Sequence, residues 1–320
     1  MQLSTPVQIE QWKHKIDYGS KILLVGSCFA SNIGAILQQL KFSVKTNPFG
    51  ILYNPLSIAN CLARLVNRTL LTEDELYQEN GLWVSYSHHG SFSGVDKNQC
   101  LLQINKGILE GGEFLKQVNF LILTFGTAWA YRLRSTGQVV GNCHKTPASE
   151  FDRELISVKE IVVTLSQILN DIKRINPQIE IIFTISPIRH WKDGAHGSQV
   201  SKATILLAVD ELIKQLNDVE YFPAYEIVMD ELRDYRYYAD DMLHPSKLAI
   251  DYIWERFEQV AISADALELF SNIKKLIAAV QHRPINNNRE EYNKFLMAMG
   301  KTLNELKNLL PEGNWKEEER

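Results

Sequence analysis

The chain has 320 residues, of which 45% are hydrophobic and 22% are charged, and it carries a net charge of −4 at pH 7. This composition excludes a disordered chain and allows either one large domain with an extension or two domains. The acidic balance excludes a broad basic surface, so we expect no nucleic acid partner. No apolar run approaches the ~20 residues that a membrane-spanning helix needs, so we expect no membrane span.

The amino terminus and the cysteines indicate a compartment. The first residues, MQLSTPVQIEQWKHK, lack the basic and apolar regions of a signal peptide. The four cysteines are scattered and form no Cys-x-x-Cys pair, which is typical of free thiols rather than of a disulfide framework. We therefore expect a soluble, cytoplasmic protein.

Three short apolar runs predict buried β-strands, at residues 21–25, 118–125 and 180–186. Almost every position in them is apolar, which is typical of parallel strands that are covered on both faces. A helix is predicted between the second and third runs. Ser157 and Glu160 have the Ser-x-x-Glu spacing of a helix start, and isoleucine and leucine then recur at helical intervals.

The alternation of strands and helices continues along the chain. Apolar periodicity predicts helices at residues 201–216 and 246–260, with a short strand within 221–230. This order predicts an α/β fold, a three-layer α/β/α sandwich around a central parallel sheet. Residues 40–118 show only short segments and turns, and we interpret them as a large insertion near the active face.

From residue 262 onward the pattern changes to two helical stretches joined by the segment HRPINNN. We therefore predict an α/β domain over residues 1–261 and a helical C-terminal extension over residues 262–320.

A hydroxyl and a thiol follow the first predicted strand directly, in the sequence Gly26-Ser27-Cys28. Ligands bind beyond the carboxyl ends of strands in open parallel sheets, and Gly26 allows a tight turn with room for a substrate. The next apolar run predicts a helix that Ser31 or Asn32 caps. Because a helix N-terminus favours negative charge, we expect a lowered pKa and a nucleophilic thiolate at Cys28.

A lone cysteine is more often structural than reactive, because cysteine is among the most buried residue types. A catalytic role for Cys28 therefore requires a base. The segment DDMLHPSK places Asp241 three residues before His244, just ahead of a predicted helix. In such a pair the carboxylate holds one imidazole nitrogen while the other nitrogen faces a nucleophile.

The residues GSCFA at positions 26–30 form the signature of the GSCFA family, and the chain resembles that family over residues 1 to about 290. The domain also resembles the SGNH/GDSL hydrolases, in which Gly-Asp-Ser follows the first strand and Asp-x-x-His precedes the last helix. This resemblance implies a flavodoxin-like fold. It also implies that Cys28 is the nucleophile, that Ser27 stands in place of the Asp, and that His244 and Asp241 are the base and its orienting partner.

The same resemblance implies two further blocks that supply oxyanion donors. The segment NPFGILYNP offers Gly50, whose N–H would act with that of Cys28. In the Gly-x-Asn block, Gly126 is present but Ala128 stands where the Asn is expected. Losing one such donor costs ~3–4 kcal/mol of transition-state stabilisation. The candidates to replace it are Thr127 and Asn142.

Arg189 and His190 follow the third predicted strand, so we expect both at the active face. The guanidinium of Arg189 could hold a carboxylate or phosphate of a substrate such as an acyl carrier, although an ordinary solvated loop is an equal alternative. A metal site built on histidines is a further alternative, but none of them shows a compact ligand spacing such as His-Glu-x-x-His. Its candidate ligands are His88, His89, His144, His190 and His244.

These observations favour an acyl ester hydrolase or an acyltransferase that acts on a small-molecule or carbohydrate ester. Cys28 attacks the carbonyl in this interpretation, and Ser27 is the rival nucleophile because a one-residue slip in the turn would present it instead. The alternatives are a non-catalytic acyl- or carbohydrate-binding protein and a metal-dependent hydrolase. The chain has neither GxGxxG nor GxxxxGK[ST], so we expect no cofactor, and we expect no metal.

Overall fold

The structure is a computed structural model that describes residues 5–281, 289–310, 313 and 315. At its centre lies a five-stranded parallel sheet with the strand order β10-β9-β5-β1-β2. This order is that of flavodoxin-like folds, so the predicted fold class is confirmed. The strands of this sheet are β1 (Lys21–Gly26), β2 (Ser43–Thr46), β5 (Phe120–Phe125), β9 (Glu180–Ile185) and β10 (Val219–Phe222).

The central strands are buried on both faces. All six residues of β5 are buried, as are the last five residues of both β1 and β9. In β1, Leu23 and Val25 contribute to one hydrophobic core, whereas Ile22 and Leu24 contribute to the other. Successive side chains of a strand point to opposite faces, so each face of the sheet needs a covering layer.

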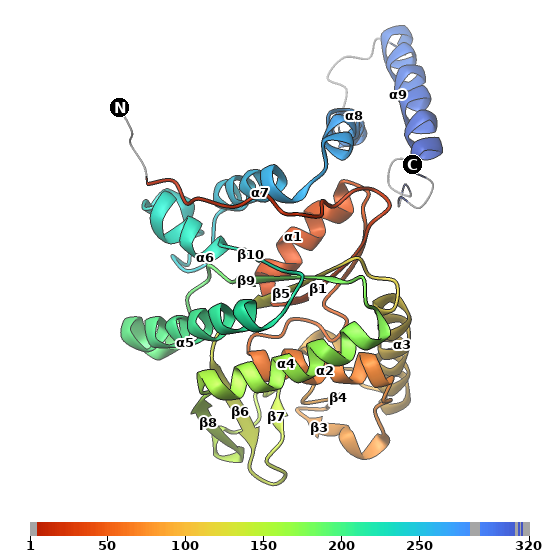
Figure 1. Ribbon diagram of the computed structural model, residues 1–320. Helices are drawn as coiled ribbons and strands as arrows, with labels where there is room; N and C mark the ends of the chain where they lie inside the picture. Colours follow the sequence, from red (N-terminus) through yellow and green to blue (C-terminus); the bar gives the residue numbers. More distant parts are fainter. Residues whose placement is uncertain (1–4, 282–288, 311–312, 314, 316–320) are drawn as a thin grey trace.

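Helices form these two layers (Figure 1). α1 and α7 pack on one face of the sheet, and α4 and α5 pack on the opposite face together with α2 and α3. The helices are α1 (Cys28–Gln39), α2 (Pro55–Asn67), α3 (Lys97–Leu115), α4 (Val158–Ile175), α5 (Gly194–Gln215), α6 (Ala224–Glu226), α7 (Lys247–Ala261), α8 (Ala264–Gln281) and α9 (Arg289–Leu309). A π-helical turn, Ile227–Glu231, continues α6.

Serine caps set the start of two predicted helices. The Ser157 hydroxyl accepts the Glu160 N–H (3.2 Å) at the start of α4, and the Ser246 hydroxyl accepts the Ala249 N–H (3.4 Å) at the start of α7. In contrast, α5 begins at Gly194, well before the predicted start at residue 201. Its first turns lack the apolar repeat on which the prediction depended.

Residues 40–118, in which the sequence shows only short segments and turns, contribute to several layers of the fold. β2 joins the edge of the central sheet and α3 covers it, so residues 40–118 are not a single insertion. Two small antiparallel sheets extend from the α2 and α4 side (Figure 1). Their strands are β3 (Tyr77–Glu79) with β4 (Leu82–Val84), and β7 (Val139–Val140) with β6 (Trp129–Leu133) and β8 (Phe151–Leu155).

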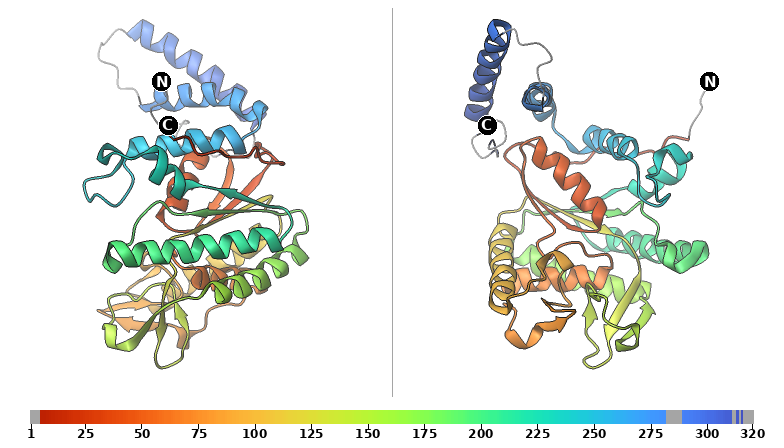
Figure 2. Two further views of the ribbon diagram at one scale, coloured as in Figure 1. Left: turned by 60° about the vertical axis from the view of Figure 1, so that its left-hand side comes forward. Right: turned by 180° about the vertical axis from the view of Figure 1, so that it is seen from behind.

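The C-terminal helices extend the layer formed by α1 and α7 (Figure 2). Phe270 of α8 shares a core with Leu37 of α1 and lies edge-on to Phe42, with ring centroids 6.0 Å apart. Leu306 of α9 belongs to the same core. A helical extension is therefore present, while its boundary at residue 262 stays a prediction. No helix within the described ranges is long and apolar enough to cross a bilayer.

Candidate active site

The corner after β1 depends on a glycine. Gly26 has φ of +146°, and a Cβ on it would lie 2.1 Å from the carbonyl oxygen of Thr124 on β5. The Ser27 N–H donates to the same oxygen (3.2 Å), so the backbone after β1 lies directly against β5. Any side chain at position 26 would force the two strands apart.

This corner lies where the strand order reverses. β1 pairs with β2 on one side and with β5 on the other. β2 is the edge strand, and the chain then crosses over β1 to form β5 on its other side. In open α/β sheets, ligands bind at this switch point, outside the carboxyl ends of the strands. Ser27 and Cys28 therefore occupy the position at which this fold most often binds a ligand.

Ser27 and Cys28 differ in accessibility. Ser27 is 1% exposed, and its hydroxyl accepts the Phe29 N–H (3.3 Å) as the cap of α1. The prediction that Ser31 or Asn32 caps this helix is therefore wrong, because the helix begins directly at Cys28. The Cys28 side chain is partly exposed. Of these two neighbours, only the thiol is open to an incoming substrate.

The expected low pKa of Cys28 is not found. Burial raises the pKa of the Cys28 thiol above its ordinary value. Hydrogen bonds from the N–H groups of Cys28 and Phe29, together with the positive charge of Lys202, lower the pKa but do not cancel the effect of burial. The thiol is thus protonated at neutral pH and needs a base to become nucleophilic.

Asp241 and His244 form a preorganised pair in the loop before α7. One carboxylate oxygen of Asp241 accepts the N–H groups of Leu243 and His244 (both 2.9 Å), and the other lies 2.5 Å from Nδ1 of His244. These contacts lower the pKa of Asp241 to about 2. With Nδ1 donating to Asp241, Nε2 of His244 is the free basic nitrogen, and no other described residue bonds to it.

The charges of Cys28 and His244 both influence a group of buried side chains that includes His190 and Lys202. Burial and then the charge of Lys202 lower the pKa of His190 to about 4, and the charge of His244 contributes in the same direction. Lys202 in turn interacts with the charge of Cys28. The ring of Tyr53 lies edge-on to that of His190, with ring centroids 5.3 Å apart. Burial and then the charge of Cys28 raise the pKa of Tyr53. The charges of Cys28 and His244 therefore both act on this group of side chains.

Lys202 is a central residue of this group that the sequence analysis missed. It lies on α5, is 2% exposed, and donates to the carbonyl oxygens of Gly126 (2.7 Å) and Ser186 (2.6 Å). These two residues follow β5 and β9, so the ammonium joins two strand ends. Burial lowers the pKa of Lys202 to about 7, and no carboxylate of the described chain pairs with it.

The glycines expected to supply oxyanion donors already use their N–H groups. The Gly50 N–H donates to the Asn47 carbonyl (2.7 Å), and the Gly126 N–H donates to the Tyr53 carbonyl (2.8 Å). The Asn47 side chain stabilises the turn after β1, because its oxygen accepts the Gly26 N–H (2.8 Å). Gly50 and Gly126 are therefore structural in this conformation.

Of the two candidates to replace the missing Asn, Thr127 is engaged through both its hydroxyl and its N–H, and Asn142 is engaged through its side-chain oxygen. The Thr127 hydroxyl lies 3.0 Å from that of Ser201, and its N–H donates to Tyr53. The side-chain oxygen of Asn142 accepts the His144 N–H (2.9 Å). The N–H groups of Cys28 and Phe29 contact the Cys28 sulfur and lower its pKa.

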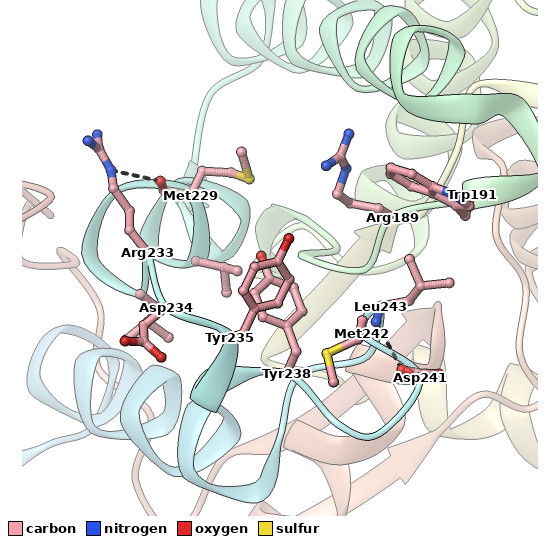
Figure 3. Close-up of a pocket in the computed structure, with 12 residues that line it drawn as sticks. Arg189, Trp191, Met229, Arg233, Asp234, Tyr235, Tyr238, Asp241, Met242 and Leu243 are labelled. Atoms are coloured by element: carbon pink, nitrogen blue, oxygen red, sulfur yellow. Dashed lines mark hydrogen bonds between the residues drawn. The ribbon is translucent and has the colours of Figure 1, made fainter.

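A cleft of about 520 Å³ opens beside the Asp241–His244 loop (Figure 3). Arg189 and Trp191, from the loop after β9, face the rings of Tyr235 and Tyr238 across it. Its volume is in the range of small-molecule sites. The lining residues are Arg189, Trp191, Val228, Met229, Leu232, Arg233, Asp234, Tyr235, Tyr238, Asp241, Met242 and Leu243.

The profile of the GSCFA family matches residues 21–257, and the profile of the GSCFA domain protein, C-terminal domain, matches residues 273–320. The chain belongs to the GSCFA family. The match covers β1 through α7, and thus both the corner and the Asp241–His244 loop of this GSCFA protein. A comparison with curated protein sequences finds no match.

Solved structures similar to this GSCFA protein include three esterases. A family 3 carbohydrate esterase from Talaromyces cellulolyticus is 11% identical (TM-score 0.37), covering 80% of this chain and 99% of its own. The family 3 carbohydrate esterase of Clostridium thermocellum is 12% identical (TM-score 0.34), covering 75% of this chain and 95% of its own. An acetyl xylan esterase from Butyrivibrio proteoclasticus is 12% identical (TM-score 0.36), covering 83% of this chain and 66% of its own.

The histidines of this GSCFA protein fall into separate places. His190 lies beside Tyr53 and Gly126, and His244 lies in the loop before α7. His88 stacks on Phe49 (4.1 Å between ring centroids), and His144 Nε2 lies 2.8 Å from the Ser85 carbonyl. Within residues 5–281 and the other described ranges, no three His, Cys, Asp or Glu side chains are close enough to share a metal ion. The geometry therefore gives no support to the metal-dependent alternative.

Proposed function

We propose that this GSCFA protein is an acyl ester hydrolase or acyltransferase in which Cys28 is the nucleophile, His244 the base and Asp241 its orienting partner. One observation carries the proposal. A partly exposed cysteine lies at the switch point of the sheet, and the loop before α7 carries an imidazole that a carboxylate already holds. This combination has the nucleophile, base and orienting group that covalent acyl chemistry requires.

The raised pKa of Cys28 defines the order of proton transfers. His244 Nε2 removes the thiol proton as the sulfur attacks the ester carbonyl, and the carbonyl electron pair moves to the oxygen. Collapse of this intermediate breaks the bond to the alkoxide, which takes the proton back from His244. The product is a thioester on Cys28. Water or an acceptor hydroxyl then attacks it, again with His244 as the base, and restores the thiol.

The helix N-terminus supplies the electrostatic stabilisation in this proposal. The N–H groups of Cys28 and Phe29 lie at the start of α1, where the helix dipole favours negative charge. An oxyanion formed beside the sulfur would meet these two donors. Gly50 and Gly126 would have to give up their present hydrogen bonds to take part.

Cys28 is preferred over Ser27 because of their environments. The Ser27 hydroxyl is buried and engaged as a helix cap, whereas the thiol is partly exposed. The acyl donor is a small-molecule or carbohydrate ester in this proposal, and an acyl carrier is one of the donors to be tested. Because thioesters exchange readily with hydroxyls and thiols, the same intermediate serves hydrolysis and transfer.

One observation favours the alternative of a non-catalytic acyl- or carbohydrate-binding protein. Ala128 is fully buried where SGNH hydrolases place an Asn, and its methyl group cannot donate a hydrogen bond to an oxyanion. Slow alkylation of Cys28 at neutral pH does not separate the alternatives, because the raised pKa predicts it for both. Formation of an acyl-enzyme does separate them.

The test is a comparison of ester cleavage among variants. With a panel of activated esters of short acids, we expect Cys28→Ala to abolish enzyme-dependent cleavage and His244→Asn to lower kcat/KM about 10²- to 10⁴-fold. Ser27→Ala should retain acylation and lose only the stability of a helix cap, about 1 kcal/mol. Cys143→Ala is the matched control, since Cys143 is the other partly exposed thiol.

Full activity of Cys28→Ala would contradict the proposal. If Ser27→Ala were then inactive while folded, the serine would be the nucleophile. If no ester in the panel reacted with the folded wild-type protein, the binding alternative would be preferred.

A further inference from the structure

Arg189 carries a charge that nothing in the described chain neutralises. Its Nε is buried without a hydrogen-bond partner, and no described carboxylate forms an ion pair with its guanidinium. The guanidinium lies over the ring of Trp191, 5.1 Å from the centroid. A buried donor without a partner is unfavourable, so this side chain is prepared for a ligand that supplies an acceptor.

The other charges around the cleft are already matched. Arg233 pairs with Asp230 (2.7 Å), Asp234 with Arg236 (2.9 Å), and Asp241 with His244. Close by, Lys202 has carbonyl partners only. Arg189 therefore contributes a positive charge without a carboxylate partner to the cleft, and Lys202 is a second such group when it is protonated. The effect of the Arg189 charge on both Tyr225 and Lys202 is consistent with this arrangement.

The remaining cleft wall is apolar and aromatic. Trp191 is 52% exposed and Tyr235 is 75% exposed, and both line the cleft with Met229 and Leu243. Exposed aromatic side chains around a concave site are typical of ligand contacts rather than of core packing. Asp241 and Leu243 belong to both the cleft and the loop that holds His244, so a ligand in the cleft would lie next to the base.

We propose that the cleft selects esters that bear an anionic group, a carboxylate or a phosphate, which Arg189 binds while the carbon skeleton lies against Trp191, Tyr235 and Tyr238. This inference rests on the proposed function and names its substrate class. A guanidinium binds both anions through paired N–H donors. Neutral acyl sugars and alkyl esters would lack this contact and react less efficiently.

Three acetyl esters with the same skeleton test the inference. The probes are 4-acetoxybenzoate, 4-acetoxyphenyl phosphate and the neutral methyl 4-acetoxybenzoate, so the carboxylate and phosphate arms are separate. The measured quantity is the ratio of kcat/KM for each anionic ester to that for the neutral ester. Comparing this ratio between the wild type and variants cancels the different intrinsic reactivities of the esters.

Arg189→Met should lower this ratio about 10- to 100-fold for at least one anion, the range expected for losing hydrogen bonds to a charged group. Arg189→Lys should restore part of it, because a lysine keeps the charge but not the paired donors. Arg174→Met is the control, since Arg174 is an exposed arginine at the end of α4 that pairs with Asp171. It should leave the ratio unchanged.

A ratio that is the same in the wild type and in Arg189→Met would overturn the inference, even if the esters react normally. A second measurement keeps it separate from the proposed function. In Cys28→Ala, calorimetric titration with 4-hydroxybenzoate and phenyl phosphate should show binding that Arg189→Met abolishes. Such binding without any ester cleavage would support the anion site and contradict the proposed chemistry. Absence of binding by both anions would contradict the anion site.

Discussion

One buried cation contributes to the pKa of Cys28. Burial raises the thiol pKa, while the charge of Lys202 lowers it. Lys202 has its own pKa lowered to about 7 by burial, and the charge of Cys28 opposes that shift. A thiolate at Cys28 therefore favours retention of the proton on Lys202, and a protonated Lys202 favours the thiolate.

Replacing Lys202 by methionine should make Cys28 harder to ionise. Without the buried charge, only the N–H groups of α1 oppose the effect of burial, so alkylation of Cys28 by iodoacetamide should require a higher pH than in the wild type. The pH profile of labelling at Cys28, read by peptide mass spectrometry, measures this shift.

The control for this experiment is Lys214→Met. Lys214 is an exposed lysine on the same helix that pairs with Asp210, and its removal should leave the profile in place. If the pH profile of Cys28 labelling were unchanged in a Lys202→Met variant that circular dichroism shows to be folded, Lys202 would not influence the pKa of Cys28.

Part of the site was predictable at the residue scale. Gly26-Ser27-Cys28 follows β1 and Asp241-x-x-His244 precedes α7, and the predicted contact between Asp241 and His244 is present. That Cys28 and His244 act together stays a prediction. Lys202 was missed because a lysine in a helix is usually solvated. A signal was present, since Lys202 falls on the same helical face as the apolar residues of α5 that follow it. The buried residues of this helix are Ser198, Ser201, Lys202, Ile205, Ala208, Val209 and Leu212.

At the scale of elements, the site depends on how closely β1 approaches β5. Gly26 adopts a backbone conformation that is essentially restricted to glycine, and the Thr124 carbonyl occupies the place of its missing side chain. The start of α1, and with it the thiol, is therefore positioned by a contact between two strands rather than by the loop itself.

Gly26→Ala should therefore lower the free energy of unfolding by more than about 3 kcal/mol, because both the dihedral strain and the clash with β5 must be relieved. Gly137→Ala is the matched control. Gly137 also has a positive φ (+71°), but nothing lies within 4 Å of its Cβ position, so it should cost only about 1 kcal/mol. Urea denaturation measures the free energy of unfolding of both variants. Equal costs would show that the close approach to β5 contributes nothing.

The elements that the sequence predicts well are the ones that are uniformly apolar. β1, β5 and β9 have buried side chains on both faces, so their composition alone distinguishes them. The sheet of β6, β7 and β8 was missed because β7 has two residues and β8 alternates buried with exposed positions only weakly. The short strands form through long-range pairing, which a local pattern does not report.

At the scale of the whole molecule, the C-terminal helices complete one hydrophobic core. Phe270 is 4% exposed and Ile273 is fully buried, in the same core as residues of α1 and α7. Removing these helices would leave a large apolar surface on the α1 and α7 layer. We therefore expect the extension to unfold together with the α/β domain.

Phe270→Ala should lower the stability of the entire chain by about 3–5 kcal/mol, the usual cost of deleting a buried phenylalanine. Calorimetry should show one transition at a reduced Tm. Met297→Ala on α9 is the control, because Met297 is 79% exposed and should change stability by less than about 0.5 kcal/mol. A second, earlier transition with an unchanged main one would show that residues 262–320 unfold independently.

The central claim is that Cys28 becomes acylated with the help of His244. Intact-mass spectrometry after brief incubation with activated esters tests it most directly. The account predicts one acyl group on the wild type that neutral hydroxylamine removes, as a thioester requires. This adduct should be absent from Cys28→Ala, much slower to form in His244→Asn, and unaffected by Cys143→Ala. An adduct of equal yield in Cys28→Ala, or one that resists hydroxylamine, would contradict the account.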